Sequence, residues 1–203
     1  MSISNEDHKR IAIAIRSAEA KTSGEIVCVL AQTSSRTTAL PVLISTVVAL
    51  ATPWLLMFFT EMTVHRILSL QVIAFLALLL FLCMPRVRVV LMPRKARRAI
   101  AHRAAMEQFT SRGIGRRKDS SGILIFVSLA ERYARIIASD EIAARVPQSE
   151  WQTAVDGLVS HMRDGRIADG FITAINMSGN ELARHFPRTA KSNDVLSDRL
   201  YLI

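Results

Sequence analysis

Two long runs without a charged residue constrain the fold of this chain more than any other feature. The first extends from Ala39 to Thr60 and the second from Ile67 to Met84. As helices they would measure about 33 Å and about 27 Å, and each can cross hydrocarbon about 30 Å thick. The short segment 61–66 joins them, which predicts antiparallel helices in a transmembrane hairpin. A buried helical pair in a water-soluble protein is the alternative, which two uncharged runs of this length disfavour.

The Lys and Arg residues outside these runs indicate how such a hairpin would be oriented. Basic residues precede the first run and follow the second, whereas Arg66 is the only one in the connecting segment. Cytoplasmic loops of membrane proteins are the ones enriched in Lys and Arg. The sequence therefore predicts a multi-pass protein of the bacterial inner (plasma) membrane, with both termini in the cytoplasm.

The chain has a formal net charge of +9, and basic residues cluster directly after the second run. A cluster in this position is typical of a segment that contacts the anionic lipids of the inner leaflet. Nucleic-acid binding is the alternative, and we do not expect it because few aromatic residues interleave with the basic ones. The residues expected to face lipid are Arg86, Arg88, Arg94, Lys95, Arg97 and Arg98.

A short apolar run before the hairpin, Glu25–Ala31, is typical of a β-strand. A single strand cannot satisfy its own backbone groups, and no other strand pattern precedes it. Its partners must therefore follow the hairpin. This predicts that residues 1–38 and 85–203 form one domain, into which the hairpin of residues 39–84 is inserted.

Two further apolar runs complete the predicted sheet. Gly122–Leu129 is continuously apolar and is expected to be central, and Tyr133–Ser139 follows at the spacing of a β-hairpin. The transmembrane hairpin and the basic helix after it would form a crossover, so the first two strands are expected to be parallel. The predicted fold is α/β, a small mixed sheet covered by helices. Helices are predicted over 94–112, 148–163 and 169–186, the last with Asp169 as its N-cap, and the tail from Pro187 is expected to lie along the surface.

Acidic residues are expected to gather at the edge of the sheet that faces away from the membrane. Glu25 begins the first strand, Asp119 precedes the second and Asp140 follows the third. Carboxylate oxygens from separate loops are the ligands that Ca²⁺ and Mg²⁺ prefer. The alternative is that Glu25 and Asp140 only cap strand ends or pair with nearby arginines. At the opposite edge, Glu131 and Arg132 are interpreted as a polar turn.

Common catalytic motifs are missing from the sequence. It contains no phosphate-binding G-x-x-x-x-G-K-[ST], no H-E-x-x-H of metalloproteases and no G-x-S-x-G of hydrolases. Its histidines are scattered without ligand spacing. Cys28 and Cys83 are not expected to form a disulfide, since a cytoplasmic domain is kept reduced. The residues alone thus define no enzyme.

Four segments of the chain are distinctive: TSGEIVCVL, GILIFVSLAERYARIIASD, GRIADGFITAI and ELARHFP. Together they resemble the TPM-domain family, in particular a short bacterial membrane branch of it. The resemblance implies an α/β sandwich. The roles it implies are diverse: phosphatase activity for a plant member, divalent-metal binding, photosystem repair and modulation of a receptor. This chain departs from the better-studied members, because its membrane segment lies inside the domain instead of at one end.

These observations favour a non-enzymatic accessory or scaffold protein whose cytoplasmic TPM-like domain binds a membrane partner. The motivating feature is a whole domain built around a hairpin without a recognisable catalytic motif. The alternative, which the resemblance implies, is a metal-dependent phosphatase-like hydrolase that uses Glu25, Asp119 and Asp140.

Overall fold

The computed structural model of the chain describes residues 3–34, 39–59, 63–84, 87, 93–114, 122–188 and 200–203. It contains two compact units. One unit comprises Met1–Ser34 together with Ala99–Ile203, and the other comprises Ser35–Arg98. The first unit holds the sheet and the second holds the two apolar helices.

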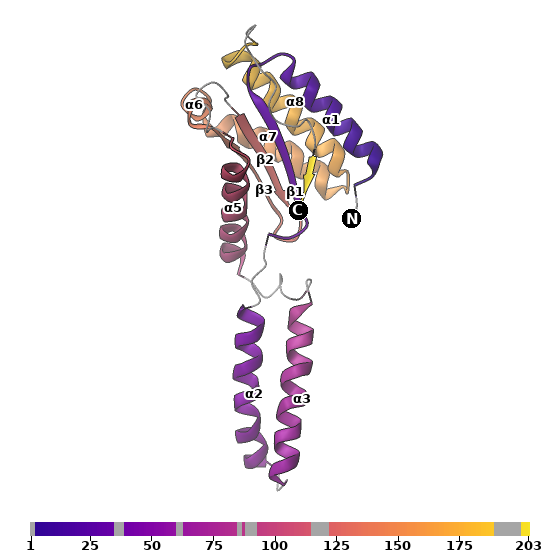
Figure 1. Cartoon of the computed structure of the whole chain (residues 1–203), viewed down its shortest axis with the longest axis vertical. Coiled ribbons are helices and arrows are strands. Elements are labelled where there is room, and N and C mark those ends of the chain that lie inside the picture. Colours follow the sequence, from indigo (N-terminus) through magenta and orange to yellow (C-terminus); the bar gives the residue numbers. More distant parts are fainter. Residues whose placement is uncertain are drawn as a thin grey trace. The chain divides into compact units, whose positions relative to one another are not determined.

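A four-stranded mixed sheet forms the centre of the first unit, in the order β3-β2-β1-β4 (Figure 1). β1 is parallel to β2 and to β4, and β3 is antiparallel to β2. The predicted α/β class and the predicted parallel pairing of the first two strands are both confirmed. The strands are β1 (Glu25–Ala31), β2 (Gly122–Ser128), β3 (Tyr133–Ala138) and β4 (Leu200–Leu202).

β1 and β2 are buried along their whole length, which agrees with their predominantly apolar sequences. Successive side chains of a strand point to opposite faces of a sheet. Ile26 and Cys28 accordingly belong to the larger apolar cluster on one face, whereas Val27 and Val29 belong to a smaller cluster on the other. The sheet is therefore covered on both faces.

Helices cover the two faces unequally (Figure 1). α1, α7 and α8 pack on the face with the larger cluster, and α5 lies on the other face, where Ala105 is buried. α1 begins with a capping box, in which Ser4 and Asp7 bond each other's backbone N–H groups. The helices are α1 (Asn5–Glu19), α5 (Arg94–Ser111), α6 (Asp140–Ala143), α7 (Gln148–Arg163) and α8 (Ile167–His185).

Two predictions about the C-terminal part were wrong. α8 begins at Ile167 with Arg166 as its N-cap, so Asp169 lies inside the first turn. There it forms an ion pair with Arg10 of α1, at 2.6 Å. The tail also does more than lie along the surface, because Leu200–Leu202 adds β4 to the open edge of β1.

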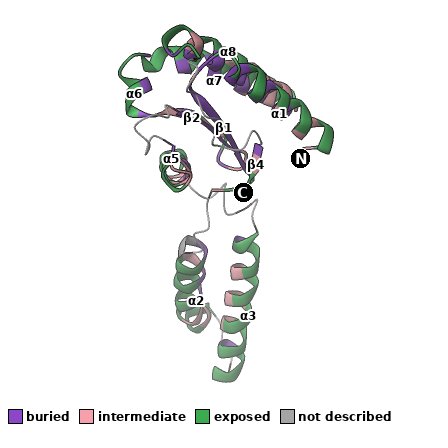
Figure 2. Cartoon of the chain, turned by 45° about the horizontal axis from the view of Figure 1, so that its top comes forward, coloured by how far each residue is buried: buried purple, intermediate pink, exposed green. Residues whose placement is uncertain are grey.

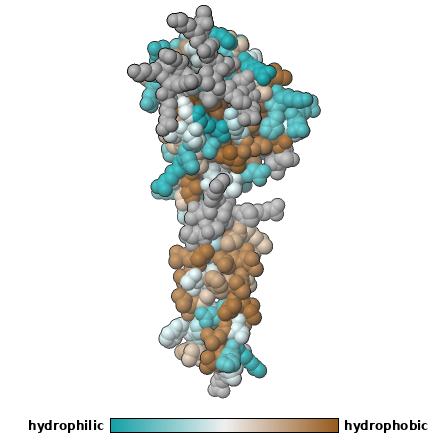
Figure 3. Space-filling model, viewed as in Figure 1, coloured by the Kyte–Doolittle hydropathy of each residue, from teal (hydrophilic) through white to brown (hydrophobic). Residues whose placement is uncertain are grey.

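The second unit consists of α2 (Ala39–Phe59) and α3 (Val64–Cys83), which pack against each other as a hairpin (Figure 1). Their large apolar side chains point outward: Trp54 is 79% exposed and Phe58 is 84% exposed. Figure 2 shows how much of both helices is exposed, and Figure 3 shows the hydrophobic surface that results. By length and composition, both helices are apolar enough to cross a membrane.

Hydroxyl groups in these two helices are satisfied by the helices themselves. Each donates to the backbone carbonyl four residues earlier: Ser45 to Pro41, Thr46 to Val42, Thr52 to Val48 and Ser69 to His65. This pattern leaves none of these hydroxyl protons in need of water, which suits an apolar environment.

Candidate functional site at the carboxyl ends of the parallel strands

The carboxyl ends of β1 and β2 meet at one edge of the sheet, because the strands are parallel and in register from Glu25↔Gly122 to Ala31↔Ser128. In open α/β sheets this is the edge where ligands bind. A cleft of about 840 Å³ lies here. Its walls include Gln32, Ser128, Arg132, Tyr133, Met162 and Arg163.

A buried carboxylate organises this edge. Glu131 is only 4% exposed, and its side chain accepts hydrogen bonds from the Ser128 hydroxyl, from Thr33 Oγ1 at 3.1 Å and from the Ser34 backbone N–H at 3.0 Å. The Ser34 hydroxyl in turn donates to Ser128 Oγ at 2.9 Å. Glu131 does lie in a turn, as predicted, but it is also the centre of a buried hydrogen-bond network, which was not predicted.

This network fastens the point where the chain leaves β1. Thr33 and Ser34 lie just beyond the end of β1 at Ala31, before α2 begins at Ala39. Glu131 lies in the turn between β2 and β3, so its bonds tie the two central strands together beyond their last ladder pair. A carboxylate that accepts several hydrogen bonds in a buried setting is a strong local anchor. The network thus holds the sheet side of the connection to the hairpin in place.

The next residue, Arg132, has a left-handed backbone conformation with φ of 51°. A residue other than glycine is uncommon in this region, and Asn or Asp would be more usual there. Its backbone N–H donates to the Leu129 carbonyl at 3.2 Å, which closes the turn. The turn places the exposed Arg132 in the lining of the cleft, to which α7 contributes the exposed Arg163 and the apolar side chains of Val159 and Met162.

The acidic residues predicted to bind metal belong to the opposite edge of the sheet. Glu25 is buried at the start of β1, and its register partner is Gly122. Asp140 is exposed at the start of α6, directly after Ser139, whose backbone N–H donates to the Gly122 carbonyl at 2.9 Å. Glu25 and Asp140 thus share an edge, as predicted. Asp119 lies outside the described residues.

Within the residues that the structure describes, no group of three or more His, Cys, Asp or Glu side chains is arranged to hold a metal ion. Two carboxylates at one edge are fewer oxygen ligands than Ca²⁺ takes from a protein site, although Mg²⁺ keeps several waters and uses one or two. A Ca²⁺ or Mg²⁺ site built from Glu25, Asp119 and Asp140 stays a prediction.

The basic residues expected to face lipid fall on α5 and before it. Arg94, Lys95, Arg97 and Arg98 lie at the beginning of α5, whereas Arg86 and Arg88 are outside the described residues. The first turn of α5 contains no acidic residue. Cations at a helix N-terminus oppose the helix dipole, at a cost of about 0.3–1 kcal/mol each. Helix stability therefore does not account for this cluster, and its contact with lipid stays a prediction.

Comparisons with known proteins agree with this architecture. A mixed sheet covered by helices on both faces places the chain among small α/β domain proteins. The model of the TPM domain matches residues 84–181, which confirms the predicted resemblance to the TPM-domain family. No curated protein matches the chain.

One solved structure is similar in fold. It is the NMR structure of the BA42 protein from the psychrophilic bacterium Bizionia argentinensis, with 19% identity and a TM-score of 0.61. The match covers 100% of this chain and 96% of that one. At this identity the likeness shows the fold alone.

Sequence reasoning missed the Glu131 network, although one signal was available. Ser128 is the last residue of the most apolar strand and Glu131 follows shortly after it, where a polar side chain has little access to water. The donors on Thr33 and Ser34, however, lie 98 and 97 residues away. No local pattern connects groups this far apart.

Proposed function

We propose that the protein is an integral protein of the bacterial inner membrane, and that its TPM domain is a cytoplasmic accessory or scaffold module for a membrane partner. One observation carries the membrane assignment. The 18-residue apolar windows of α2 and α3 are each only 11% buried, so their side chains need an apolar solvent. A contiguous apolar surface of this kind on a soluble protein would cause aggregation.

The charge distribution supports an orientation with both termini in the cytoplasm. Lys and Arg are frequent on both sides of the hairpin, and Arg66 is the only one between the two apolar runs. Such an asymmetry directs the short connection between the helices across the membrane.

The position of the hairpin in the fold supports a scaffold role. It is inserted between β1 and β2, which are hydrogen-bonded neighbours at the centre of the sheet. Glu131 fastens the residues that follow β1. A partner that binds the hairpin in the membrane would therefore bind an element continuous with the domain core, and this continuity is what a scaffold requires.

Cysteine labelling tests the topology. In a Cys83→Ser background, Thr63→Cys places a thiol between the helices and Lys9→Cys places one on exposed α1. Cys28 is a built-in negative control, because burial raises the pKa of its thiol well above the usual range. We expect a membrane-impermeant maleimide to label Thr63→Cys in cells with a permeable outer envelope, and Lys9→Cys only after lysis. The reverse pattern, or release by alkaline carbonate, would contradict the proposal.

Crosslinking in native membranes tests the accessory role. We expect a reproducible membrane-protein partner to be crosslinked to the full chain and retained after purification in mild detergent. The purified protein should not hydrolyse a generic phosphomonoester with added Mg²⁺ or Ca²⁺. Robust metal-dependent turnover without any stable partner would argue for the hydrolase alternative instead.

A further inference from the structure

The outer edge of β3 is open. β3 lies at the end of the strand order, and within the described residues its only strand neighbour is β2. In an antiparallel pair, every second residue turns its backbone N–H and C=O toward the partner strand. Ser139 bonds Gly122 on β2, so Ile137 and Arg135 also face β2, whereas Ala138 and Ile136 direct their backbone groups outward. Such an edge is a template for another strand.

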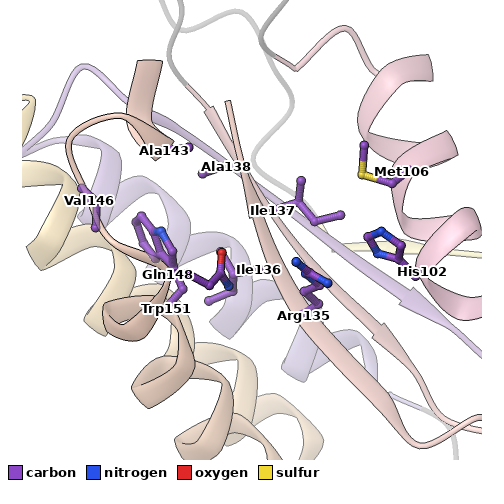
Figure 4. A pocket seen from close by; sticks show the side chains of 10 residues that line it. All are labelled: His102, Met106, Arg135, Ile136, Ile137, Ala138, Ala143, Val146, Gln148 and Trp151. Atoms are coloured by element: carbon purple, nitrogen blue, oxygen red, sulfur yellow. The ribbon is translucent and has the colours of Figure 1, made fainter. Parts of the chain in front are cut away.

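A groove of about 240 Å³ runs beside this edge. Figure 4 shows β3 between its two walls. His102 and Met106 of α5 lie on one side of the strand, and Val146 and Trp151 of the helical layer lie on the other. A strand that paired with β3 would therefore have side chains from both helical layers to contact.

The two walls differ in chemistry. Arg135 shares the face of β3 with Ile137, which packs in the α5-side cluster, and it is exposed. Within the described residues Arg135 forms no ion pair, and His102 lies beside it in the groove. The opposite wall has the apolar side chains of Ala143, Val146 and Trp151, together with the amide of Gln148.

We propose that the β3 edge binds an extended segment of a partner protein in which acidic and small apolar residues alternate. The segment would add a fifth strand to the sheet, a recognised mode of peptide binding in which backbone bonds supply affinity and alternate side chains supply specificity. Its acidic side chains would face Arg135 and His102, and its apolar side chains would face Val146. The inference rests on the proposed function, for which it specifies how the partner is recognised.

A second copy of the chain is a poorer occupant. Antiparallel pairing of two β3 edges would place the two Arg135 side chains on the same face of the joined sheet, and like charges across paired strands are destabilising. The formal charge of +9 on each chain adds repulsion between copies. An acidic partner has neither disadvantage.

Peptide binding to the full chain in detergent micelles tests the proposal. The probes are two fluorescent peptides of the same length, one alternating Glu and Val and the other alternating Lys and Val, followed by anisotropy. We expect the glutamate peptide to bind at least about tenfold more tightly, and Arg135→Glu to reverse this preference. The proposal is overturned if the two peptides bind with equal affinity or if neither peptide binds.

Ala138→Pro tests the backbone bonds separately. It removes an outward N–H while leaving the N–H groups that bond β2, a position where an edge strand tolerates proline. We expect affinity for the glutamate peptide to fall about threefold to tenfold, with circular dichroism unchanged. Arg135→Ala, at an exposed position of β3, serves as a second variant that preserves the fold.

The outcomes separate this inference from the proposed function. If Ala138→Pro retains the crosslinked membrane partner at the level of the unmodified chain, the partner binds elsewhere, and only the β3 proposal falls. If cysteine labelling contradicts the membrane topology while the peptide preference is observed, the proposed function falls instead. Dimerisation of the unmodified chain that Ala138→Pro abolishes would show that the edge pairs copies, and it would overturn the proposal.

Discussion

The domain and the hairpin are both rich in apolar residues, but the domain buries most of them and the hairpin exposes most of them. In the domain, side chains of β1 and β2 are buried on both faces of the sheet. In the hairpin, most large apolar side chains point away from the partner helix. Composition is therefore a poor guide to burial, and the difference supports the proposal that the two regions lie in different solvents.

Backbone and polar groups follow the same division. In α2 and α3 the hydroxyl groups bond within their own helix, four residues back. In the domain, polar groups bond across long stretches of chain: Thr22 Oγ1 donates to the Phe186 carbonyl at 2.6 Å, and Thr33 Oγ1 donates to Glu131. An open sheet with unpaired edges could not lie in lipid, whereas two helices can.

Replacing a buried phenylalanine should produce the largest effect on the domain. Phe171 of α8 is 0% exposed, and Phe171→Ala should lower the free energy of unfolding by about 3–5 kcal/mol through lost burial and the cavity left behind. Phe58→Ala is the matched control, because Phe58 of α2 is 84% exposed. Urea unfolding in detergent micelles, followed by near-ultraviolet circular dichroism, measures both. A comparable loss in Phe58→Ala would erase the distinction between the two regions.

A pair of isoleucines tests the solvent of each region directly. Ile73 at the middle of α3 is 62% exposed and Ile13 of α1 is 65% exposed, so in the absence of a membrane the two side chains have nearly the same exposed fraction. Ile73→Arg should cost about 2.5–3.5 kcal/mol of membrane insertion, which a fractionation assay would detect as protein outside the membrane. Ile13→Arg should leave both insertion and domain stability nearly unchanged. Equal tolerance of the two substitutions would mean that α3 lies in water.

The sequence allowed the regular elements to be predicted well where the apolar pattern is continuous. β1 was predicted as Glu25–Ala31 and has these bounds, because its short apolar run lies between Ser23-Gly24 and Gln32-Thr33, which mark its two ends. α7 was likewise predicted at Gln148–Arg163, where an apolar stripe of helical spacing includes Trp151 and Leu158.

Features that depend on distant partners could not be predicted in this way. β4 has only three residues, and it forms because β1 offers an open edge far away in the sequence. Asp169 was misassigned as an N-cap because its partner, Arg10, is 159 residues away. The hydrogen-bond network of Glu131 was missed for the same reason, since Thr33 and Ser34 are 98 and 97 residues away. Local propensity describes single elements, whereas these contacts exist only in the assembled domain.

Removing the buried carboxylate should have an intermediate effect that is confined to the domain. Glu131→Ala would leave the Ser128 hydroxyl and the Ser34 N–H without their acceptor, at a cost of about 1–3 kcal/mol in the free energy of unfolding. Glu131→Gln keeps one acceptor oxygen and should lose less. Glu150→Ala, at an exposed position of α7, is the control. If Glu131→Ala has the same free energy of unfolding as this control, the network does not fasten the strand ends. Membrane insertion of the hairpin should be unaffected in all three variants.

The smallest expected effect concerns the acid side of the stability curve and again separates the two regions. Hydrogen bonds from the Ser4 hydroxyl and backbone N–H hold the pKa of Asp7 below its usual 3.8, and nearby Arg10 lowers it further. A carboxyl with a depressed pKa in the folded state stabilises the domain fully above about pH 4, and this contribution is lost as the pH falls through the folded-state pKa. Asp7→Asn should therefore make unfolding less dependent on pH in the acid range, whereas α2, which contains no titratable side chain, should keep its helicity throughout. Unfolding curves at a series of pH values give the slope of the free energy of unfolding against pH for the unmodified chain and for Asp7→Asn. Identical slopes for the two proteins would mean that the capping box does not contribute to acid sensitivity.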